Sequence, residues 1–301
     1  MQRGEKMSKN QLIIGGDKRM VYCADFLGKS GLKTYAYGFS DFDFKRDFFI
    51  SENLFSYVKN ADTVILPTPF SKDNTFVFSP LCDEKILISD VLKNMKKGAF
   101  LFGGNLSEGV LEDAKKYKIF AFDILKDEEL AVKNASLCGE GALLYAISSS
   151  DKSLLYSNCL VTGFGRIGKT SANIFKNICA KTYVYARKET DRAYIMSYGY
   201  IPVSNENLKN EIENIDIVIN TVPYMIFDEG IISNMKNDAV IIDTASYPGG
   251  VDNVAALKHG IKTVSALALP GKVSPADAGF FMGGAVLKIL SENGGKKCLK
   301  I

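Results

Sequence analysis

Three glycines in the stretch CLVTGFGRIGKTSANIFK, residues 159–176, fall where an apolar strand would turn into a helix. Gly163 would permit the tight turn, Gly165 would let a pyrophosphate approach the backbone, and Gly168 would let the helix pack closely on the strand. A G-x-G-x-x-G sequence is weak evidence by itself, but here a strand precedes it and a second strand follows at the right distance. The stretch therefore predicts a dinucleotide-binding turn with phosphates at the helix start. Its expected contact residues are Gly163, Gly165, Arg166, Ile167 and Gly168.

Short apolar runs alternate with amphipathic stretches along the whole chain. The runs before residue 150 are QLIIGG, TYAYGF, DTVILP, AFLFGG and KIFAFDI, and the pattern restarts with SNCLVTGF, KTYVYAR, DIVINTV, DAVIIDTA and IKTVSALAL. Strand and helix at this spacing predict right-handed crossovers and parallel sheets with helices on both faces. Because 301 residues is long for one core, two domains are expected.

The expected fold class is α/β, with two doubly wound domains and a cleft between them. Residues 1–150 would form a flavodoxin-like or Rossmann-like domain that binds substrate, and residues 151–301 a Rossmann domain that binds the dinucleotide. The boundary falls near Ser150, after the helical stretch SLCGEGALLYAISSS. A terminal helix, residues 274–296, either packs back on the first domain or caps the second.

Composition and charge narrow the class of protein. Hydrophobic residues make up 47% and charged residues 24% of the chain, which is typical of a globular protein. A net charge of +3 is too small to indicate nucleic-acid binding, no apolar run reaches the length of a membrane span, and the start MQRGEKMSKN lacks the apolar core of a secretion signal. Six cysteines without a CxxC pair indicate a reducing compartment, and one histidine leaves few ligands for a metal. We expect a cytoplasmic protein without a metal site, a membrane segment or a nucleic-acid partner.

The end of the strand that follows the glycine turn indicates which dinucleotide is bound. An NAD-binding domain usually places an acidic residue there to accept hydrogen bonds from the ribose hydroxyls. This chain has VYARKET, in which Arg187 and Lys188 would suit the 2′-phosphate of NADP. The alternative is that both side chains belong to a solvated strand end. We expect NADP rather than NAD.

Two further segments complete the predicted cofactor crevice, because ligands of open parallel sheets lie beyond the carboxyl ends of the strands. They are NTVP, residues 220–223, and DTASYPGG, residues 243–250. Backbone groups there would line the ribose and the nicotinamide. Helix capping by Asp243 or Ser246 is the alternative, and both interpretations stay open. The candidate residues are Asn220, Thr221, Val222, Pro223, Asp243 and Ala245.

The order of motifs along the chain resembles one family, that of the A subunit of dipicolinate synthase. The likeness rests on GFGRIGKT, VYARKE, INTVP, IDTASYPGGVD and LALPGKVSPADAG, and IIGGDKR, VILP and GEGALLYAI extend it over nearly the whole chain. The resemblance implies an NADP-dependent oxidoreductase of sporulation that oxidises dihydrodipicolinate, or its hydrated tetrahydro precursor, to pyridine-2,6-dicarboxylate. It also implies a flavoprotein-like partner, the B subunit of the synthase. We further expect a homo-oligomer.

The coenzyme half is also similar to D-2-hydroxyacid dehydrogenases and adenosylhomocysteine hydrolases. Three alternatives follow, namely an NADP-dependent D-2-hydroxyacid dehydrogenase, a hydrolase that oxidises its substrate transiently, and an NADP-sensing protein without catalysis. The dehydrogenases take the hydroxyl proton of their substrate with a histidine near the end of the coenzyme domain. The single histidine here, His259, stands at a predicted helix end before Gly260, where a cation is favourable without any catalytic role.

The first glycine-rich stretch, IIGGDKR at residues 13–19, follows a strand and opens a helix but lacks the third glycine. Backbone amides and a basic side chain could clamp a substrate carboxylate there, whereas a plain turn with a solvated helix face is the alternative. Residues at the ends of two further strands are candidates for polar lining. The substrate-binding candidates are Gly16, Asp17, Lys18, Arg19, Thr68, Gly104 and Asn105.

Formation of an aromatic ring needs a group that takes a ring proton, and Glu140 is the catalytic candidate. It lies between two glycines in GEGALLYAI, which we place at the start of the helix between the domains. A helix-start carboxylate that the helix dipole favours, without a catalytic role, is the alternative.

Overall fold

The computed structural model describes residues 10–39, 46–51 and 53–294. The chain forms two compact units, one from residues up to Ala131 together with residues from Pro275 onward, and the other from Val132–Ser274. The division falls before the predicted boundary near Ser150. The reason is that helix α5 (Glu128–Ser149) places Ala142 and Ala146 in the core of the second unit.

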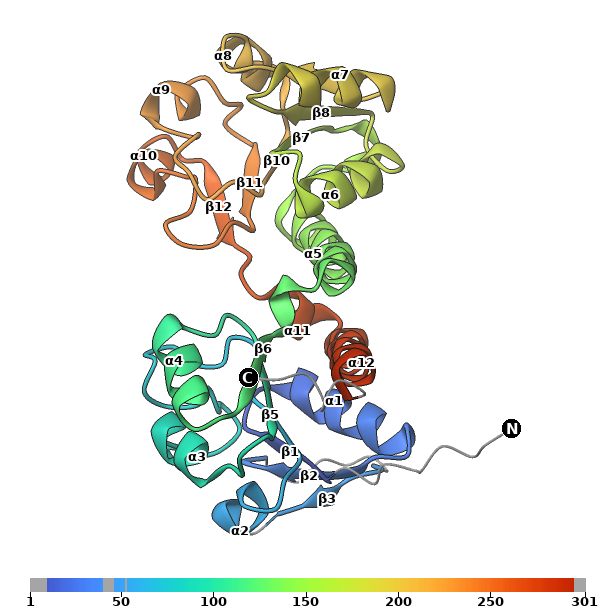
Figure 1. Ribbon diagram of the computed structural model, residues 1–301. Helices are drawn as coiled ribbons and strands as arrows, with labels where there is room; N and C mark the ends of the chain where they lie inside the picture. Colours follow the sequence, from blue (N-terminus) through green and yellow to red (C-terminus); the bar gives the residue numbers. More distant parts are fainter. Residues whose placement is uncertain (1–9, 40–45, 52, 295–301) are drawn as a thin grey trace, which may run out of the picture. The chain divides into compact units, whose positions relative to one another are not determined.

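The first unit contains a six-stranded sheet in which every pairing is parallel (Figure 1). Its strands are β1 (Asn10–Ile14), β2 (Lys33–Tyr37), β3 (Phe49–Ile50), β4 (Thr63–Ile65), β5 (Phe100–Gly103) and β6 (Phe120–Asp123). The order β3-β2-β1-β4-β5-β6 is the Rossmann order and not the flavodoxin order. The order reverses between β1 and β4, so a ligand crevice is expected beyond the carboxyl ends of these two strands.

The second unit repeats this topology. Its strands are β7 (Asn158–Thr162), β8 (Lys181–Tyr185), β9 (Ile201–Val203), β10 (Ile217–Asn220), β11 (Val240–Asp243) and β12 (Lys262–Ser265). They are paired in parallel in the order β12-β11-β10-β7-β8-β9, which is the Rossmann order again. The order reverses between β7 and β10. The predicted class of two α/β Rossmann-like domains is confirmed.

Helices cover both faces of each sheet (Figure 1). In the first unit they are α1 (Lys18–Lys29), α2 (Leu54–Val58), α3 (Ile88–Asn94), α4 (Glu108–Lys116) and α12 (Pro275–Gly294). In the second unit they are α5, together with α6 (Arg166–Lys176), α7 (Glu189–Ser197), α8 (Leu208–Glu211), α9 (Glu229–Ile232), α10 (Asn253–Lys258) and α11 (Leu269–Val273). Short 3₁₀ turns span Ile124–Lys126, Leu154–Tyr156 and Ile212–Asn214.

The terminal helix α12 packs against α1 in the first unit, which is one of the two positions that the sequence leaves open for it. Glycines permit the close approach, because a methyl group at Gly279 would lie 2.3 Å from the Arg19 carbonyl oxygen. The rings of Phe26 and Phe280 meet edge to face with centroids 4.5 Å apart. The predicted helix runs two residues further, and these lie outside the described part of the chain.

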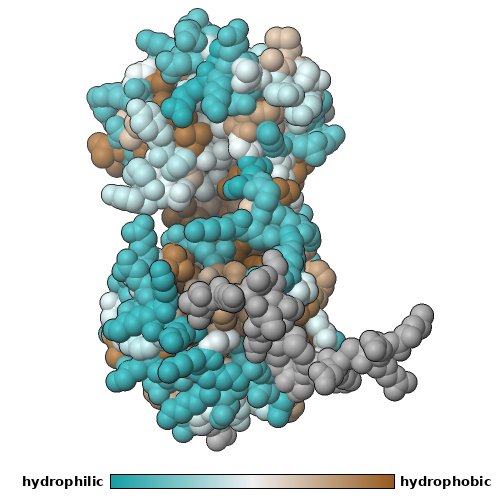
Figure 2. All heavy atoms as spheres, in the orientation of Figure 1, coloured by the Kyte–Doolittle hydropathy of each residue, from teal (hydrophilic) through white to brown (hydrophobic). Residues whose placement is uncertain are grey.

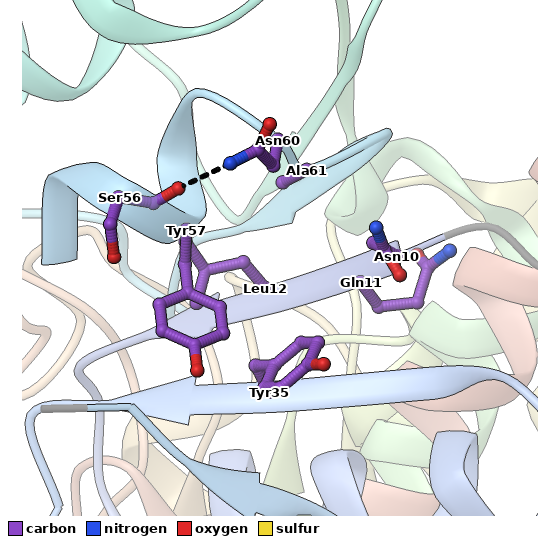
Figure 3. Close-up of a pocket in the computed structure, with 8 residues that line it drawn as sticks. All are labelled: Asn10, Gln11, Leu12, Tyr35, Ser56, Tyr57, Asn60 and Ala61. Carbon is purple, nitrogen blue, oxygen red and sulfur yellow. Dashed lines mark hydrogen bonds between the residues drawn. The ribbon is translucent and has the colours of Figure 1, made fainter. Parts of the chain in front are cut away.

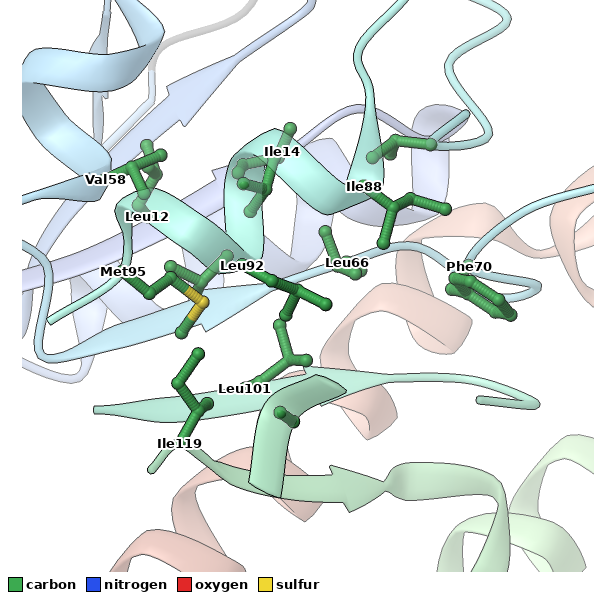
Figure 4. Close-up of a cluster of buried hydrophobic side chains, with 14 of the residues drawn as sticks. Leu12, Ile14, Val58, Leu66, Phe70, Ile88, Leu92, Met95, Leu101 and Ile119 are labelled. Carbon is green, nitrogen blue, oxygen red and sulfur yellow. The ribbon is translucent and has the colours of Figure 1, made fainter. Parts of the chain in front are cut away.

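Apolar side chains fill the space between sheet and helices. Figure 4 shows one such cluster, in which side chains of β1 and β5 meet side chains of α3, among them Leu12, Leu101 and Leu92. Hydrophilic residues cover most of the face seen in Figure 2. Among the described residues, no helix is both long and apolar enough to span a membrane.

Asp216, immediately before β10, holds the amino-terminal edge of the second sheet. Its carboxylate, 7% exposed, accepts hydrogen bonds from the Asn158 amide at 2.9 Å, Lys152 at 3.0 Å and Lys236 at 2.8 Å. Burial raises the pKa of Asp216, but the hydrogen bonds from Lys236, Asn158 and Lys152 outweigh burial and hold the pKa below its ordinary value.

We expect Asp216→Asn to lower the free energy of unfolding at pH 7 by about 2–4 kcal/mol. Because the folded pKa is depressed, this stabilisation is present above the unfolded pKa of about 3.9 and is lost as pH falls through the folded pKa. Urea unfolding at pH 7 and pH 3 tests this, with the exposed Asp238→Asn as control. An equal loss of stability at both pH values would contradict it.

Candidate functional site

The glycine turn of the second unit has the geometry of a phosphate-binding loop. The Gly163 amide donates to the Tyr185 carbonyl at 2.9 Å, and its φ of 87° lies in the left-handed region that glycine tolerates. A methyl group at Gly168 would lie 2.1 Å from the Gly163 carbonyl oxygen, so only glycine allows this packing. At Gly165, the exposed N-cap of α6, a methyl group would meet no atom within 4 Å.

These three environments match the three roles predicted from the sequence. Gly163 serves the turn and Gly168 serves helix packing, and the open space at Gly165 would let a pyrophosphate approach the backbone. Arg166 and Ile167 form the first turn of α6, whose amides point toward that space. The residues present therefore fit a dinucleotide.

Cations gather at the carboxyl end of β8. Arg187 and Lys188 follow the strand and are exposed, as a 2′-phosphate ligand requires. Arg192 on α7 reaches the same place, because its guanidinium donates to the carbonyls of Ala186 at 3.0 Å and Arg187 at 2.7 Å. Burial raises the pKa of Tyr185, and the nearby positive charges of Arg187 and Arg192 oppose that rise.

Arg192 is absent from the residues predicted from the sequence. The available signal was its position in the first turn of a helix that starts at Glu189, because helical side chains lean toward the amino end. From that position the long side chain of Arg192 reaches back to the carboxyl end of β8.

A buried polar network joins the carboxyl ends of three neighbouring strands. Thr162, Asn220 and Asp243 are register partners on β7, β10 and β11. Asn220 donates to Asp243 Oδ1 at 2.8 Å and accepts from the Thr162 hydroxyl, and Asp243 also accepts from the Ala245 amide at 3.1 Å. Asp243 thus caps no helix, so the capping alternative is wrong for this residue.

The network fixes the two segments that were predicted to line the crevice. The Thr221 hydroxyl donates to the Thr162 carbonyl at 2.7 Å, and the Val222 amide donates to Asn220 Oδ1 at 3.2 Å. Asn220 itself is fully buried. Asn220 holds the loop that follows β10, so that the backbone from Thr221 to Pro223 stays at the edge of the sheet.

The glycine turn of the first unit has the same backbone hydrogen bond as the turn of the second unit, but different side chains surround it. The Gly15 amide donates to the Tyr37 carbonyl at 2.8 Å, as Gly163 does to Tyr185. Aligning NQLIIG with NCLVTG places Asp17 where Gly165 stands and Met20 where Gly168 stands. A methyl group at Gly16 would lie 2.3 Å from Met20 Cγ. Asp17, a carboxylate that caps α1, therefore stands where the second unit leaves open space for a pyrophosphate.

Asp17 and Arg19 form a pair at this turn. Asp17 caps α1, and its carboxylate accepts two hydrogen bonds from Arg19 Nε, at 2.9 and 3.2 Å, and one from Nη2 at 2.8 Å. Nη2 also donates to the Thr68 carbonyl at 2.6 Å. Arg19 therefore neutralises Asp17 and ties the turn after β1 to the loop after β4. Lys18 remains exposed beside it.

The other first-unit candidates lie along the same edge of the sheet. Gly104 is buried against Thr68, because a methyl group at Gly104 would lie 2.4 Å from the threonine Oγ1. Asn105 is exposed, with a φ of 63°, and its amide donates to Asp123 at 3.0 Å. Two hydroxyl oxygens near this edge, those of Thr68 and Ser79, are buried without a hydrogen-bond partner among the described residues. Ser79 was not predicted.

The expected position of Glu140 is wrong. Helix α5 begins at Glu128, so Glu140 lies within a 22-residue helix and not at its start. The helix-dipole alternative fails for the same reason. Glu140 is exposed on α5 and stays a catalytic candidate on chemistry alone.

A pocket of about 310 Å³ opens at the other end of the first sheet (Figure 3). It is lined by the start of β1, including Asn10, and by Tyr35, Tyr57 and Asn60, whose amide donates to the Ser56 carbonyl at 2.8 Å. Ligands of such sheets bind at the carboxyl ends, so this amino-terminal pocket is not the candidate site. Within the described ranges, no group of three or more metal-binding side chains occurs.

Each of the two units matches a known protein family. Residues 10–125 match the family model for the N-terminal domain of the dipicolinate synthase A subunit, and residues 147–263 match that of the D-isomer specific 2-hydroxyacid dehydrogenase NAD binding domain. The A subunit of dipicolinate synthase from Bacillus subtilis (strain 168) is 31% identical over 283 residues, which cover 93% of this chain and 95% of the relative.

Solved structures agree with these matches. The crystal structure of the dipicolinate synthase A subunit from Bacillus halodurans superimposes with a TM-score of 0.85 at 26% identity, covering 94% of this chain and 98% of the other. The dipicolinate synthase A chain from Bacillus subtilis gives a TM-score of 0.85 at 28% identity, covering 97% and 98%. The resemblance stated from the sequence motifs is confirmed.

Proposed function

The chain belongs to the family of the dipicolinate synthase A subunit, and from that premise we propose that it oxidises dihydrodipicolinate, or its hydrated tetrahydro precursor, to pyridine-2,6-dicarboxylate with NADP. The family match supports the reaction, and the observation that carries the cofactor part of the proposal is the open space at Gly165 in an otherwise closed glycine turn. The match of the second unit to a dehydrogenase NAD binding domain supports a nicotinamide cofactor. The cations at the end of β8 favour NADP.

The residues of the second unit would hold the cofactor. The amides at the start of α6 would bind the pyrophosphate, Arg187, Lys188 and Arg192 would surround the 2′-phosphate, and the backbone at Thr221 and Ala245 would line the nicotinamide side. When bound, the nicotinamide supplies a hydride acceptor.

The residues of the first unit would orient the substrate. Oxidation of a dihydro ring removes one hydride and one ring proton, and the hydrated precursor also loses water. Aromatisation favours the step, so the protein must mainly hold two carboxylates, position the ring and accept a proton. The crevice between β1 and β4 offers the amides of the Gly16 turn and the exposed Lys18 for the carboxylates, and Arg19, already paired with Asp17, would orient that turn. Glu140 is the proposed proton acceptor.

A coupled assay tests the reaction. The protein is mixed with NADP, dihydrodipicolinate synthase and the substrates of that enzyme, and ultraviolet spectra are followed for NADPH and for pyridine-2,6-dicarboxylate. Equal formation of both is expected. Absence of any substrate-dependent NADPH signal would favour an NADP-sensing protein. Cofactor that stays bound through purification without net turnover would favour a hydrolase.

The proposed function also includes an assembly with a second subunit. We propose the flavoprotein-like B subunit of the synthase as partner and a homo-oligomeric state during sporulation in the cytoplasm. Co-purification from sporulating cells, followed by sedimentation, tests both. A monomer that captures no B subunit would overturn them.

Arg187→Ala is expected to remove most of the preference for NADP over NAD. Loss of a charge-assisted contact to the 2′-phosphate costs about 1.5–3 kcal/mol, or roughly tenfold to a hundredfold in NADP affinity. NAD affinity should stay unchanged, because NAD lacks that phosphate. Isothermal titration of both cofactors measures the effect, with Lys181→Ala at the opposite end of β8 as control. Equal affinities for NADP and NAD in the unmutated protein would refute the assignment.

A further inference from the structure

Ser79 carries a hydroxyl group that the fold does not use. Its Oγ is buried and has no hydrogen-bond partner among the described residues. The side chain rests on two glycines, since a methyl group at Gly15 would lie 3.0 Å from Ser79 Cβ and one at Gly38 would lie 3.2 Å from Oγ. Both glycines have left-handed φ, 64° and 82°. Ser79 thus sits directly on the turns that follow β1 and β2.

The backbone on both sides of Ser79 is fixed. The Phe78 amide donates to the Phe70 carbonyl at 2.9 Å, and the Ser79 carbonyl accepts from the Cys82 amide at 3.2 Å. The backbone that carries Ser79 is therefore held in place by the fold itself.

Packing does not explain the hydroxyl. An alanine would fill the same space above Gly15 without burying an unpaired polar group, which is unfavourable in a protein interior. Buried polar groups without partners are rare in native structures and point to a function when they lie at a site.

The surroundings of Ser79 indicate an anionic ligand. Gly15 begins the turn at the reversal of strand order, where ligands of this fold bind. Exposed Lys18 lies at the start of α1, and the charge of Asp17 is already paired with Arg19. Gly16 and Lys18 donate no amide hydrogen bond within the described ranges. Donors without acceptors thus lie at this edge of the sheet, which suits a carboxylate.

We propose that Ser79 is a substrate-binding residue whose hydroxyl donates a hydrogen bond to one carboxylate of the ring dicarboxylate. This assignment rests on the proposed function. It gives the substrate a fixed contact on the β1–β2 side of the turn, while Arg19 and Thr68 stand on the β4 side.

Steady-state kinetics of Ser79→Ala tests the assignment. The Michaelis constant for the dicarboxylate should rise about tenfold to a hundredfold, and kcat should change less than about twofold, because a hydrogen bond to a charged group is lost on binding. Affinity for NADP should stay unchanged. The melting temperature should stay the same or rise, because the variant removes a buried hydroxyl that has no partner among the described residues. Ser79→Cys, which keeps the side-chain size with a weaker donor, should give an intermediate Michaelis constant.

Thr63→Val is the matched control. Thr63 begins β4 in the same unit, at the amino-terminal edge, and its hydroxyl is likewise buried without a partner among the described residues. This variant should leave the Michaelis constant unchanged. Dicarboxylate turnover with an unchanged Michaelis constant in Ser79→Ala would overturn the Ser79 assignment alone. Absence of dicarboxylate turnover by the unmutated protein would overturn the proposed function and this assignment together.

Discussion

Gly165→Ala is expected to lose at least a hundredfold in cofactor affinity while its melting temperature stays unchanged. The loss follows because about two charge-assisted hydrogen bonds to the pyrophosphate, each worth roughly 1.5–3 kcal/mol, need the backbone within reach. The stability is preserved because a methyl group at this position meets no protein atom within 4 Å and the φ of −80° suits alanine. Thermal unfolding and cofactor titration on the same sample measure both effects.

Gly168→Ala should behave in the opposite way. Its methyl group would lie 2.1 Å from the Gly163 carbonyl oxygen, and a backbone atom cannot move aside as a flexible side chain can. We expect a loss of about 3 kcal/mol or more of unfolding free energy, together with loss of cofactor binding. Gly109→Ala on α4, where a methyl group meets open space, is the control. If Gly165→Ala lowered the melting temperature as much as Gly168→Ala does, the separation of the two roles would be wrong.

Most of the fold could be predicted from the alternation of apolar runs and amphipathic stretches along the chain. Buried parallel strands have continuous apolar runs, so the ten runs recognised in the sequence all became strands. The two strands that were not predicted, β3 and β9, are edge strands with two and three residues. Such short segments contain too few residues to show a period.

Helix α5 shows why the predicted start of this helix was wrong. The glycines on either side of Glu140 suggested a helix start, but both lie inside the helix and serve close packing. A methyl group at Gly139 would lie 2.7 Å from Ile174, and one at Gly141 would lie 2.8 Å from Leu269. These contacts bring together segments far apart in the sequence, which local patterns do not report.

The residues of the candidate site also differ in whether local sequence could predict them. The glycine roles in the second unit were predictable because backbone conformation and close approach select glycine locally. Arg192 and Ser79 were not, since each acquires its place from a folded contact, Arg192 with the end of β8 and Ser79 with the turns after β1 and β2. Asp17 and Arg19 were recognised as charges, but their mutual pairing became evident only in the structure.

The single histidine decides between the dicarboxylate and a 2-hydroxy acid as substrate. A dehydrogenase that oxidises an alcohol needs a base for the hydroxyl proton, and such a base contributes about a hundredfold to ten-thousandfold. His259 follows α10 and precedes β12, so it lies at the amino-terminal edge of the second sheet, whereas Gly165 lies at the carboxyl-terminal edge. Its Nε2 is 3.5 Å from the Glu229 carboxylate. That position fits the end of a helix and lies at the opposite edge of the sheet from the glycine turn.

The protein is therefore expected to oxidise lactate or glycerate at least about a thousandfold less efficiently, by kcat/KM, than a dihydro-ring dicarboxylate. His259→Gln should keep dicarboxylate oxidation within about twofold, because the side chain is partly exposed and lies at the opposite edge of the sheet from the glycine turn. Lys258→Gln, which removes the neighbouring partner of Glu229, is the matched control. A hundredfold loss of activity in His259→Gln, with folding and NADP binding intact, would mean that the imidazole acts as the base after all. In that case a 2-hydroxy acid would become the better substrate assignment, because the ring proton of a dihydrodicarboxylate can pass to a carboxylate or to water without an imidazole.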